Sequence, residues 1–255
     1  MITSCQHITE KSKYHESNED SLFIGDDIII IADGMGGESN GSMASKIAVD
    51  TISKLLNGKC IDVVSYEDAK FLILSAIKEA DKNIQKYVDC NPDAYGMGTT
   101  ILIMMLHAKS ISLGWCGDSR CYAYGDKGLL QLTKDHSFVQ ELIDAKEITA
   151  EESLNHPDSN LITRYVGGGE DMCVPDYTKY ELNDVRTILL CSDGLSGYCN
   201  DSSIETVLST NRDCEKLPGE LMNLAISHGS DDDITIVCYN PRHKRSSIFN
   251  WFSHK

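Results

Sequence analysis

No apolar run in the sequence approaches the roughly 18 to 20 residues that a helix needs to cross a bilayer. The segment from Met1 to Glu10 also lacks the basic stretch followed by an apolar one that marks an export signal. No long low-complexity tract interrupts the chain, which argues against global disorder. We therefore expect a soluble cytoplasmic protein with no integral membrane segment.

Positive charge is also scarce. The chain has 23 Lys and Arg against 39 Asp and Glu, which gives a formal net charge of −16. Affinity for nucleic acid comes mainly from basic residues that neutralise phosphates, and this chain shows no basic stripe. Nucleic acid is therefore a poor partner, and a two-metal nuclease is a poor interpretation of the acidic residues.

Cysteine pairs with the C-x-x-C spacing of a zinc site are absent, although the chain has 10 cysteines. Cys116, Cys191 and Cys238 lie within apolar, strand-like runs. We expect buried, reduced thiols rather than disulfides, which agrees with a cytoplasmic location.

What the chain does contain is enough apolar sequence for one sizeable core, since 41% of its 255 residues are hydrophobic. We expect one domain over residues 1–240 and a short tail over 241–255. The tail is basic and aromatic, as in Arg242, Phe249 and Trp251. A solvated tail is the simplest interpretation, and weak docking to a membrane or a partner is the alternative.

Apolar periodicity predicts both helices and strands. Helices are expected over 42–56 and 66–88, in a polar stretch over 137–154, and as two short helices before the last strand. Strands are expected over 28–32, 100–106, 110–115, 120–124, 129–132, 174–182, 187–192 and 234–239. Short turns between consecutive strands indicate antiparallel pairing, and the lack of clean alternation indicates burial on both faces. The segregation of strands from helices predicts an α+β sandwich.

Acidic residues recur at the ends of the expected strands. They are Glu19 and Asp20, Asp33, Asp118, Asp193, and Asp231 to Asp233. Taken singly, each is explained by a turn or a backbone cap. If the strands ending at Asp33 and Asp193 are neighbours, however, their carboxylates converge and repel unless cations neutralise them. Mg²⁺ and Mn²⁺ prefer such oxygen ligands, and a pair of them about 3.5 to 4 Å apart can activate water for attack on phosphorus.

Several short motifs occur in one order along the chain. They are NEDS (18–21), ADGMGG (32–37), GTT (98–100), GDSR (117–120), LTKDHS (132–137), ITRYVGG (162–168), CSDGLS (191–196) and DDDITIV (231–237). With this series the chain resembles the protein phosphatase 2C family, in its compact bacterial form, from about residue 10 to residue 239. The resemblance implies a four-layer α-β-β-α sandwich of two antiparallel sheets flanked by helices. It also implies metal-dependent hydrolysis of phosphoserine and phosphothreonine on proteins.

By this resemblance, two Mn²⁺ or Mg²⁺ ions are held by one group of residues. Asp33 would bridge the two metals, Glu19 and the Gly34 carbonyl would complete one site, and Asp193 with Asp232 would complete the other. Asp33, Asp193 and Asp232 are thus the residues on which catalysis would depend, and Asp20 would be an outer partner. A third, weaker metal would lie near Asp118, with Asp193 contributing to it.

The chain departs from the family pattern at a few positions. His15 stands four residues before Glu19, where the family usually has the Arg that holds the substrate phosphate, and Lys11 and Lys13 lie nearby. Asp233 stands where Asn is more common, and could add charge or replace a hydrogen bond to a neighbouring loop.

The source of the proton for the leaving alcohol also differs. Met35 replaces the His of eukaryotic members, as it commonly does in bacterial ones. His136 is then a candidate proton donor, with a structural role in a turn as the simpler interpretation. The segment from Lys134 to Ile162 resembles the family's flap, a variable insertion near the active site.

The functional prediction is a monomeric phosphatase that acts on phosphoproteins and opposes a protein Ser/Thr kinase. The alternative is a non-catalytic binding module on the same fold, which the change at His15 alone favours. A serine hydrolase is disfavoured because the sequence from Gly194 to Gly197 is not G-x-S-x-G.

Overall fold

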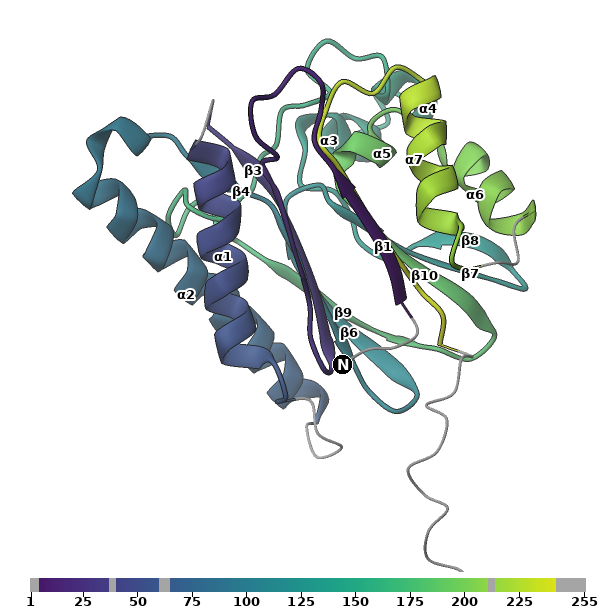
Figure 1. Cartoon of the computed structure of the whole chain (residues 1–255), viewed down its shortest axis with the longest axis horizontal. Helices are drawn as coiled ribbons and strands as arrows, with labels where there is room; N and C mark the ends of the chain where they lie inside the picture. Colours follow the sequence, from purple (N-terminus) through teal and green to yellow (C-terminus); the bar gives the residue numbers. More distant parts are fainter. Residues whose placement is uncertain (1–4, 37–39, 60–64, 211–213, 242–255) are drawn as a thin grey trace, which may run out of the picture.

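The computed structural model of the chain describes residues 5–36, 40–59, 65–210 and 214–241 (Figure 1). The tail from Arg242 onward lies outside the described residues, so the prediction about it stays a prediction. Within the described part of the chain, no helix is long and apolar enough to cross a membrane.

Two sheets form the centre of the molecule. The six-stranded sheet has the order β2 (Asp20–Ile24), β3 (Ile28–Met35), β5 (Ile101–Leu106), β6 (Ser110–Cys116) and β9 (Asp176–Glu181), with β4 (Gly98–Thr99) paired to β3. The five-stranded sheet has the order β1 (Cys5–Glu10), β11 (Ile234–Tyr239), β10 (Val185–Cys191), β7 (Arg120–Gly125) and β8 (Gly128–Gln131). All of these pairings are antiparallel, as predicted.

Helices cover the outer faces of both sheets (Figure 1). On one side, α1 (Asn40–Leu56) and α2 (Tyr66–Cys90) lie on the six-stranded sheet. On the other, α6 (Asp201–Thr210) and α7 (Leu217–Ser227) lie on the five-stranded sheet. The remaining helices are short: η1 (Pro92–Ala94), α3 (Phe138–Asp144), α4 (Ala150–Ser153) and α5 (Asp193–Ser196). The predicted four-layer α-β-β-α sandwich is confirmed.

Three apolar cores separate the four layers. Along β3, Ile28 and Ile30 pack against α1 and α2, while Ile29 and Ile31 face the other sheet. The third core lies between the five-stranded sheet and α7, around residues such as Leu189 and Leu221. Side chains still alternate along the strand, but both faces are buried, which explains why the sequence shows no apolar and polar alternation.

The longest helix has clear boundaries in the sequence. Ser65 caps α2 by accepting a hydrogen bond from the Asp68 N–H, and the Asp68 side chain accepts from the Ser65 N–H in return. The helix ends just before Pro92, which cannot continue a helix. Its buried side includes Ile73, Ile77 and Ile84, at helical spacing.

Two features differ from the sequence-based expectation. Strands β1, β2 and the two-residue β4 were not predicted; β1 and β2 are short edge strands with polar residues. Strands β6 and β7 follow each other in the chain but belong to different sheets. The turn between them, Gly117 to Ser119, therefore crosses from one sheet to the other and places Asp118 where the sheets meet.

Candidate metal centre

A cleft of about 280 Å³ lies at one end of the sandwich. It is lined by His15, Glu19, Asp33, Gly34, Met35, Gly36, Thr100, Asp118, Asn160, Ile162, Asp193 and Asp232. Every residue predicted to bind metal is in this group, and so is His15. A larger hollow of about 780 Å³ runs along the outer side of α2, between residues such as Phe71 and Val174, but no such carboxylate cluster lines it. The smaller cleft is therefore the candidate site.

Asp33 lies near the end of β3 and is held through its main chain. Its N–H donates to Thr100 Oγ1 at 3.0 Å, and its carbonyl oxygen accepts from Thr99 Oγ1 and from the Thr100 N–H, both at 2.8 Å. Across the β2–β3 ladder, Asp20 pairs directly with Asp33. Residues directly opposite in a ladder have close side chains, so two carboxyl groups are forced together here.

Asp193 reaches the same point from the other sheet. It is the first residue of α5, directly after β10, whereas Asp33 belongs to the six-stranded sheet. The expectation that the strands ending at Asp33 and Asp193 are neighbours is therefore wrong, because the two strands belong to different sheets. Their carboxylates converge across the sandwich instead. The two carboxyl groups are close enough for Asp193 to raise the pKa of Asp33. Asp118 and Asp232 complete the cluster from the β6–β7 turn and the residue pair before β11.

Two glycines allow Glu19 and α1 to approach β3. A Cβ on Gly34 would lie 2.1 Å from the Gly41 carbonyl oxygen, and one on Gly41 would lie 2.5 Å from Glu19 Oε2. Both distances are too short for a Cβ atom, so a side chain at either position would have to displace its neighbour, and glycine permits the close approach. The first turn of α1 is thereby brought against the Glu19 carboxylate, where the positive end of the helix dipole favours negative charge.

The electrostatics of the cluster oppose ionisation in the absence of cations. Burial, followed by the charges of neighbouring carboxylates, raises the pKa of Asp20, Asp33 and Asp118 well above the ordinary value. Burial and the Asp193 charge raise the pKa of Asp232 to about 7. The shifts favour the protonated forms of these groups unless positive charge is supplied.

The donor set fits hard divalent cations. Asp20 Oδ1 and Asp193 Oδ1 are buried and have no hydrogen-bond partner within the described part of the chain. The other Asp20 oxygen is satisfied, since Ser192 Oγ donates to Oδ2 at 2.8 Å. Buried acceptors without partners are rare in proteins, and a site of carboxylate oxygens suits Mg²⁺ or Mn²⁺.

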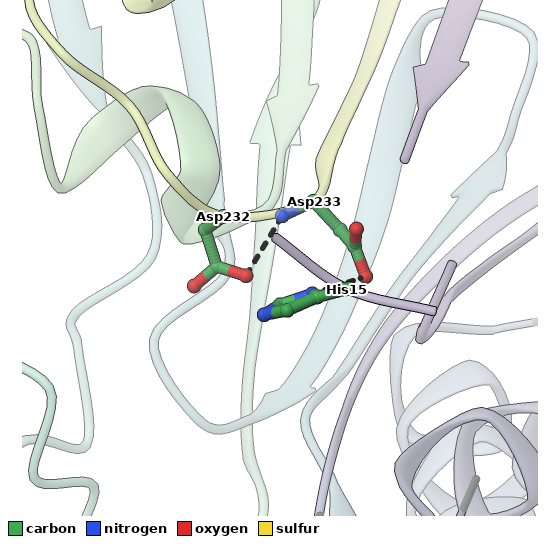
Figure 2. A group of neighbouring side chains, drawn as sticks. All are labelled: His15, Asp232 and Asp233. Atoms are coloured by element: carbon green, nitrogen blue, oxygen red, sulfur yellow. Dashed lines mark hydrogen bonds and ion pairs between the residues drawn. The ribbon is translucent and has the colours of Figure 1, made fainter. Parts of the chain in front are cut away.

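His15 lines the cleft and contacts the acidic turn before β11. Its Nδ1 lies 3.2 Å from Asp233 Oδ2, and the ring sits between the Asp232 and Asp233 side chains (Figure 2). Burial opposes protonation, but the contact with Asp233 and the charges of nearby carboxylates outweigh it and raise the His15 pKa. Lys13 does not line the cleft; its ammonium group lies over the Tyr14 ring.

His136 is not among the residues that line the cleft. Its Nδ1 accepts from the Gly117 N–H at 3.2 Å, and Nε2 lies 3.1 Å from Asp176 Oδ2. The ring also stacks on Trp115, with 6.1 Å between centroids. With both nitrogens engaged, His136 ties the β6–β7 turn to β9, so the structure favours its turn role over proton donation.

Sequence reasoning assigned no role to several residues at the site. Thr99 and Thr100 anchor Asp33, and the GTT motif was the signal that could have revealed them. Asn160 and Ile162 line the cleft from the end of the segment that resembles a flap. Ser192, beside Asp193 in the CSDGLS motif, holds Asp20.

Comparisons with known proteins agree with this geometry. The family model described as protein phosphatase 2C matches residues 9–229. The serine/threonine phosphatase stp of Listeria welshimeri is 32% identical over 234 residues, which cover 90% of this chain and 92% of that protein. The serine/threonine protein phosphatase PstP of Mycobacterium tuberculosis is 34% identical over 230 residues, which cover 90% of this chain and 43% of PstP.

Solved structures show the same fold. A crystal structure of a bacterial serine phosphatase superposes with a TM-score of 0.87 at 29% identity, over 96% of this chain and 100% of that one. The catalytic domain of PstP in complex with two manganese ions superposes with a TM-score of 0.79 at 31% identity, over 92% and 96% of the two chains. The motif order, the cleft and the extent of these matches lead to one conclusion: the chain belongs to the protein phosphatase 2C family.

Proposed function

We propose that the chain is a metal-dependent phosphatase that hydrolyses phosphoserine and phosphothreonine on proteins. The observation that carries the proposal is the convergence of Asp33, Asp193 and Asp232 on one cleft, with a buried Asp193 oxygen left without a partner. The phosphatase names of the relatives support the substrate class. A non-catalytic module would not need to keep so many buried carboxylates together, because each adds repulsion.

We assign metal-binding roles to residues that line the cleft. Asp33 would contact both cations, Glu19 and the Gly34 carbonyl would hold one, and Asp193 with Asp232 would hold the other. Asp20 lies behind Asp33 and would orient it, and Asp118 with Asp193 would hold a third, weaker ion. When bound, Mn²⁺ or Mg²⁺ lowers the pKa of water and neutralises phosphoryl oxygens. The two manganese ions of the PstP domain support a two-metal arrangement.

We propose that His15 binds the substrate phosphate. Its Nδ1 is engaged by Asp233, and the ring lines the cleft. Met35 also lines the cleft and has no proton to donate to the leaving alcohol. We propose His15 or solvent water as the proton source, since His136 lies outside the lining.

The proposal extends to the setting of the enzyme. We infer a cytoplasmic monomer that opposes a Ser/Thr protein kinase. Free thiols at the described cysteines, most of them buried, support a reducing compartment. Phosphoserine and phosphothreonine on proteins arise from kinase reactions, so a kinase must supply the substrates.

A phosphothreonine peptide tests the proposal. The purified protein should release phosphate when Mn²⁺ or Mg²⁺ is present and lose this activity after exhaustive chelation, because the carboxylates alone supply no positive charge to the phosphate. Re-addition of Mn²⁺ should restore the activity. Turnover that persists at the parental rate after chelation would refute metal dependence.

A further inference from the structure

Asp233 is buried, with 2% of its surface exposed, and lies next to the proposed metal ligand Asp232. Its carboxylate makes three contacts with one loop. Oδ1 accepts from the Ser12 N–H at 2.7 Å, and Oδ2 accepts from the Glu19 N–H at 2.6 Å. Oδ2 also lies 3.2 Å from His15 Nδ1 (Figure 2). One side chain thus binds the start, the middle and the end of the loop that connects β1 to β2.

The loop contains no regular secondary structure between Lys11 and Glu19, so these contacts largely define its course. A further bond, from Ser12 Oγ to the Asp231 carbonyl oxygen at 2.6 Å, fastens it to the same turn. Hydrogen bonds to a charged acceptor are the strong ones, and a buried carboxylate left unpaired would be costly. Asp233 therefore holds the N–H side of the Glu19 main chain, while the Gly34 N–H and Ser45 Oγ hold its carbonyl oxygen.

Asp233 also contacts Asp232, a proposed ligand of the other metal ion. Its main-chain N–H donates to Asp232 Oδ1 at 2.7 Å, as the dashed line in Figure 2 shows. Glu19 and Asp232 belong to opposite metal sites in the proposed assignment. Asp233 contacts both of them, Glu19 through its carboxylate and Asp232 through its main-chain N–H. The same carboxylate engages His15 Nδ1 and leaves the opposite ring nitrogen pointing away from Asp233 (Figure 2).

We propose that Asp233 is a positioning residue of the metal centre: it sets Glu19 relative to Asp232 so that the cations bind tightly, and it orients His15. The proposal rests on the proposed function, because it assumes that Glu19 and Asp232 hold cations. This positioning role differs from simply adding negative charge near the cations, which any nearby carboxylate could do.

Two variants of Asp233 separate geometry from charge. Asp233→Asn keeps the shape and removes the charge and one acceptor, while Asp233→Glu keeps the charge and displaces the oxygens by a methylene. Both should weaken Mn²⁺ binding, measured by calorimetry without substrate, by about tenfold or more, which is typical of residues that orient metal ligands. Activity should recover at saturating Mn²⁺, because every proposed ligand is still present. Melting in chelator verifies the fold of each variant.

The matched control is Asp231→Asn, which removes the same charge from the same turn. Asp231 is exposed, its carboxylate accepts from the Tyr198 hydroxyl, and its contact with Ser12 is through the main chain. This variant should bind Mn²⁺ as the parent does. Equal weakening by Asp231→Asn would overturn the proposal, because the effect would then be one of charge.

Parental Mn²⁺ affinity in folded Asp233→Asn and Asp233→Glu would also overturn it. If Asp233→Asn does not fold, the Asp233→Glu variant decides, since it retains the charge at the buried position. If the parent protein binds no Mn²⁺, both the proposed function and this inference are refuted. If the parent binds Mn²⁺ and the Asp233 variants bind it equally well, this inference alone is refuted.

Discussion

Asp33 and Asp193 lie where little water can solvate a charged carboxylate, and burial raises the pKa of both. Among the described residues, each interacts mainly with neighbouring carboxyl groups rather than with a Lys or Arg. The exception is a weaker attraction between Asp193 and Arg120. Arg120 itself is engaged elsewhere, because Nε and Nη2 donate to Asp135 at 2.9 and 2.7 Å. The free energy of this arrangement is unfavourable without cations, so the residues are maintained for chemistry rather than stability.

Substitution at these two positions should therefore affect activity far more than folding. Asp33→Asn and Asp193→Asn should each lower kcat by at least about a hundredfold, since each removes charge from the cation cluster at nearly constant volume. Steady-state kinetics on a phosphothreonine peptide at saturating Mn²⁺ provide the measurement. Asp50→Asn, on the exposed side of α1, is the control and should match the parent. A kcat close to the parental value in either cluster variant, once loaded with metal, would reject these assignments.

Individual carboxylates could be predicted from the sequence because each stands in a short motif at a strand end. Asp33 and Asp193 were found in this way, and the structure places both at the cleft. The contact between His15 and Asp233 could not be predicted. Their separation in the chain is large, neither belongs to a periodic pattern, and the contact depends on how an irregular loop folds onto a turn.

At the scale of elements, the approach of α1 to β3 decides where Glu19 lies. The Gly34 N–H donates to the Glu19 carbonyl oxygen at 3.2 Å, and Ser45 Oγ on α1 donates to the same oxygen at 2.6 Å. The helix, the strand and the loop before β2 are thus joined at one residue. Any side chain inserted between them must displace Glu19.

A methyl group at Gly41 tests this packing. Gly41→Ala would place a Cβ 2.5 Å from Glu19 Oε2 and 2.8 Å from the Gly34 carbonyl carbon. We expect weaker Mn²⁺ binding by about tenfold, since the ligand is displaced rather than removed. The matched control is Gly219→Ala in α7, where a Cβ meets no atom within 4 Å. That change should instead raise stability by about 0.5 to 1 kcal/mol, as alanine does in helices. Unchanged Mn²⁺ affinity in Gly41→Ala would show that the close contact is relieved elsewhere.

Helices and central strands were predictable where a long periodic or apolar pattern exists, as in α2 and β3. Strands β1 and β2 were missed because each lies at a sheet edge and is only partly buried. Edge strands gain their pairing from the neighbouring strand, here β11 and β3, and this long-range contact leaves little trace in local sequence.

At the scale of the molecule, the sandwich brings the acidic ends of two sheets together. Its three apolar cores supply the free energy that holds this arrangement, while the carboxylate cluster opposes it. The division of β6 and β7 between sheets was not predictable from their short connection. The same division places Asp118 beside Asp193, whose charge raises the pKa of Asp118.

The stability of the whole protein should therefore depend on both pH and cations. Carboxyl groups whose pKa is raised on folding bind more protons in the folded than in the unfolded state, between the unfolded value near 4 and the folded value. The free energy of unfolding must then fall as pH rises through this range, which for Asp232 ends at a pKa of about 7. In chelator, Tm should be lower at about pH 7.5 than at about pH 5.5. Mn²⁺ should stabilise more at the higher pH, because cations bind ionised ligands.

Thermal unfolding at the two pH values, with chelator and with Mn²⁺, measures both effects. At a concentration about a hundredfold above its dissociation constant, Mn²⁺ should add about 2.7 kcal/mol to the free energy of unfolding. General repulsion in a chain of net charge −16 also lowers stability as pH rises, so a variant must separate the two causes. Asp232→Asn changes the total charge little but removes one raised pKa, and it should reduce the pH dependence in chelator. A pH dependence identical to the parent's would assign it to general repulsion, and a Tm in chelator that rises with pH would contradict the raised pKa values of the cluster.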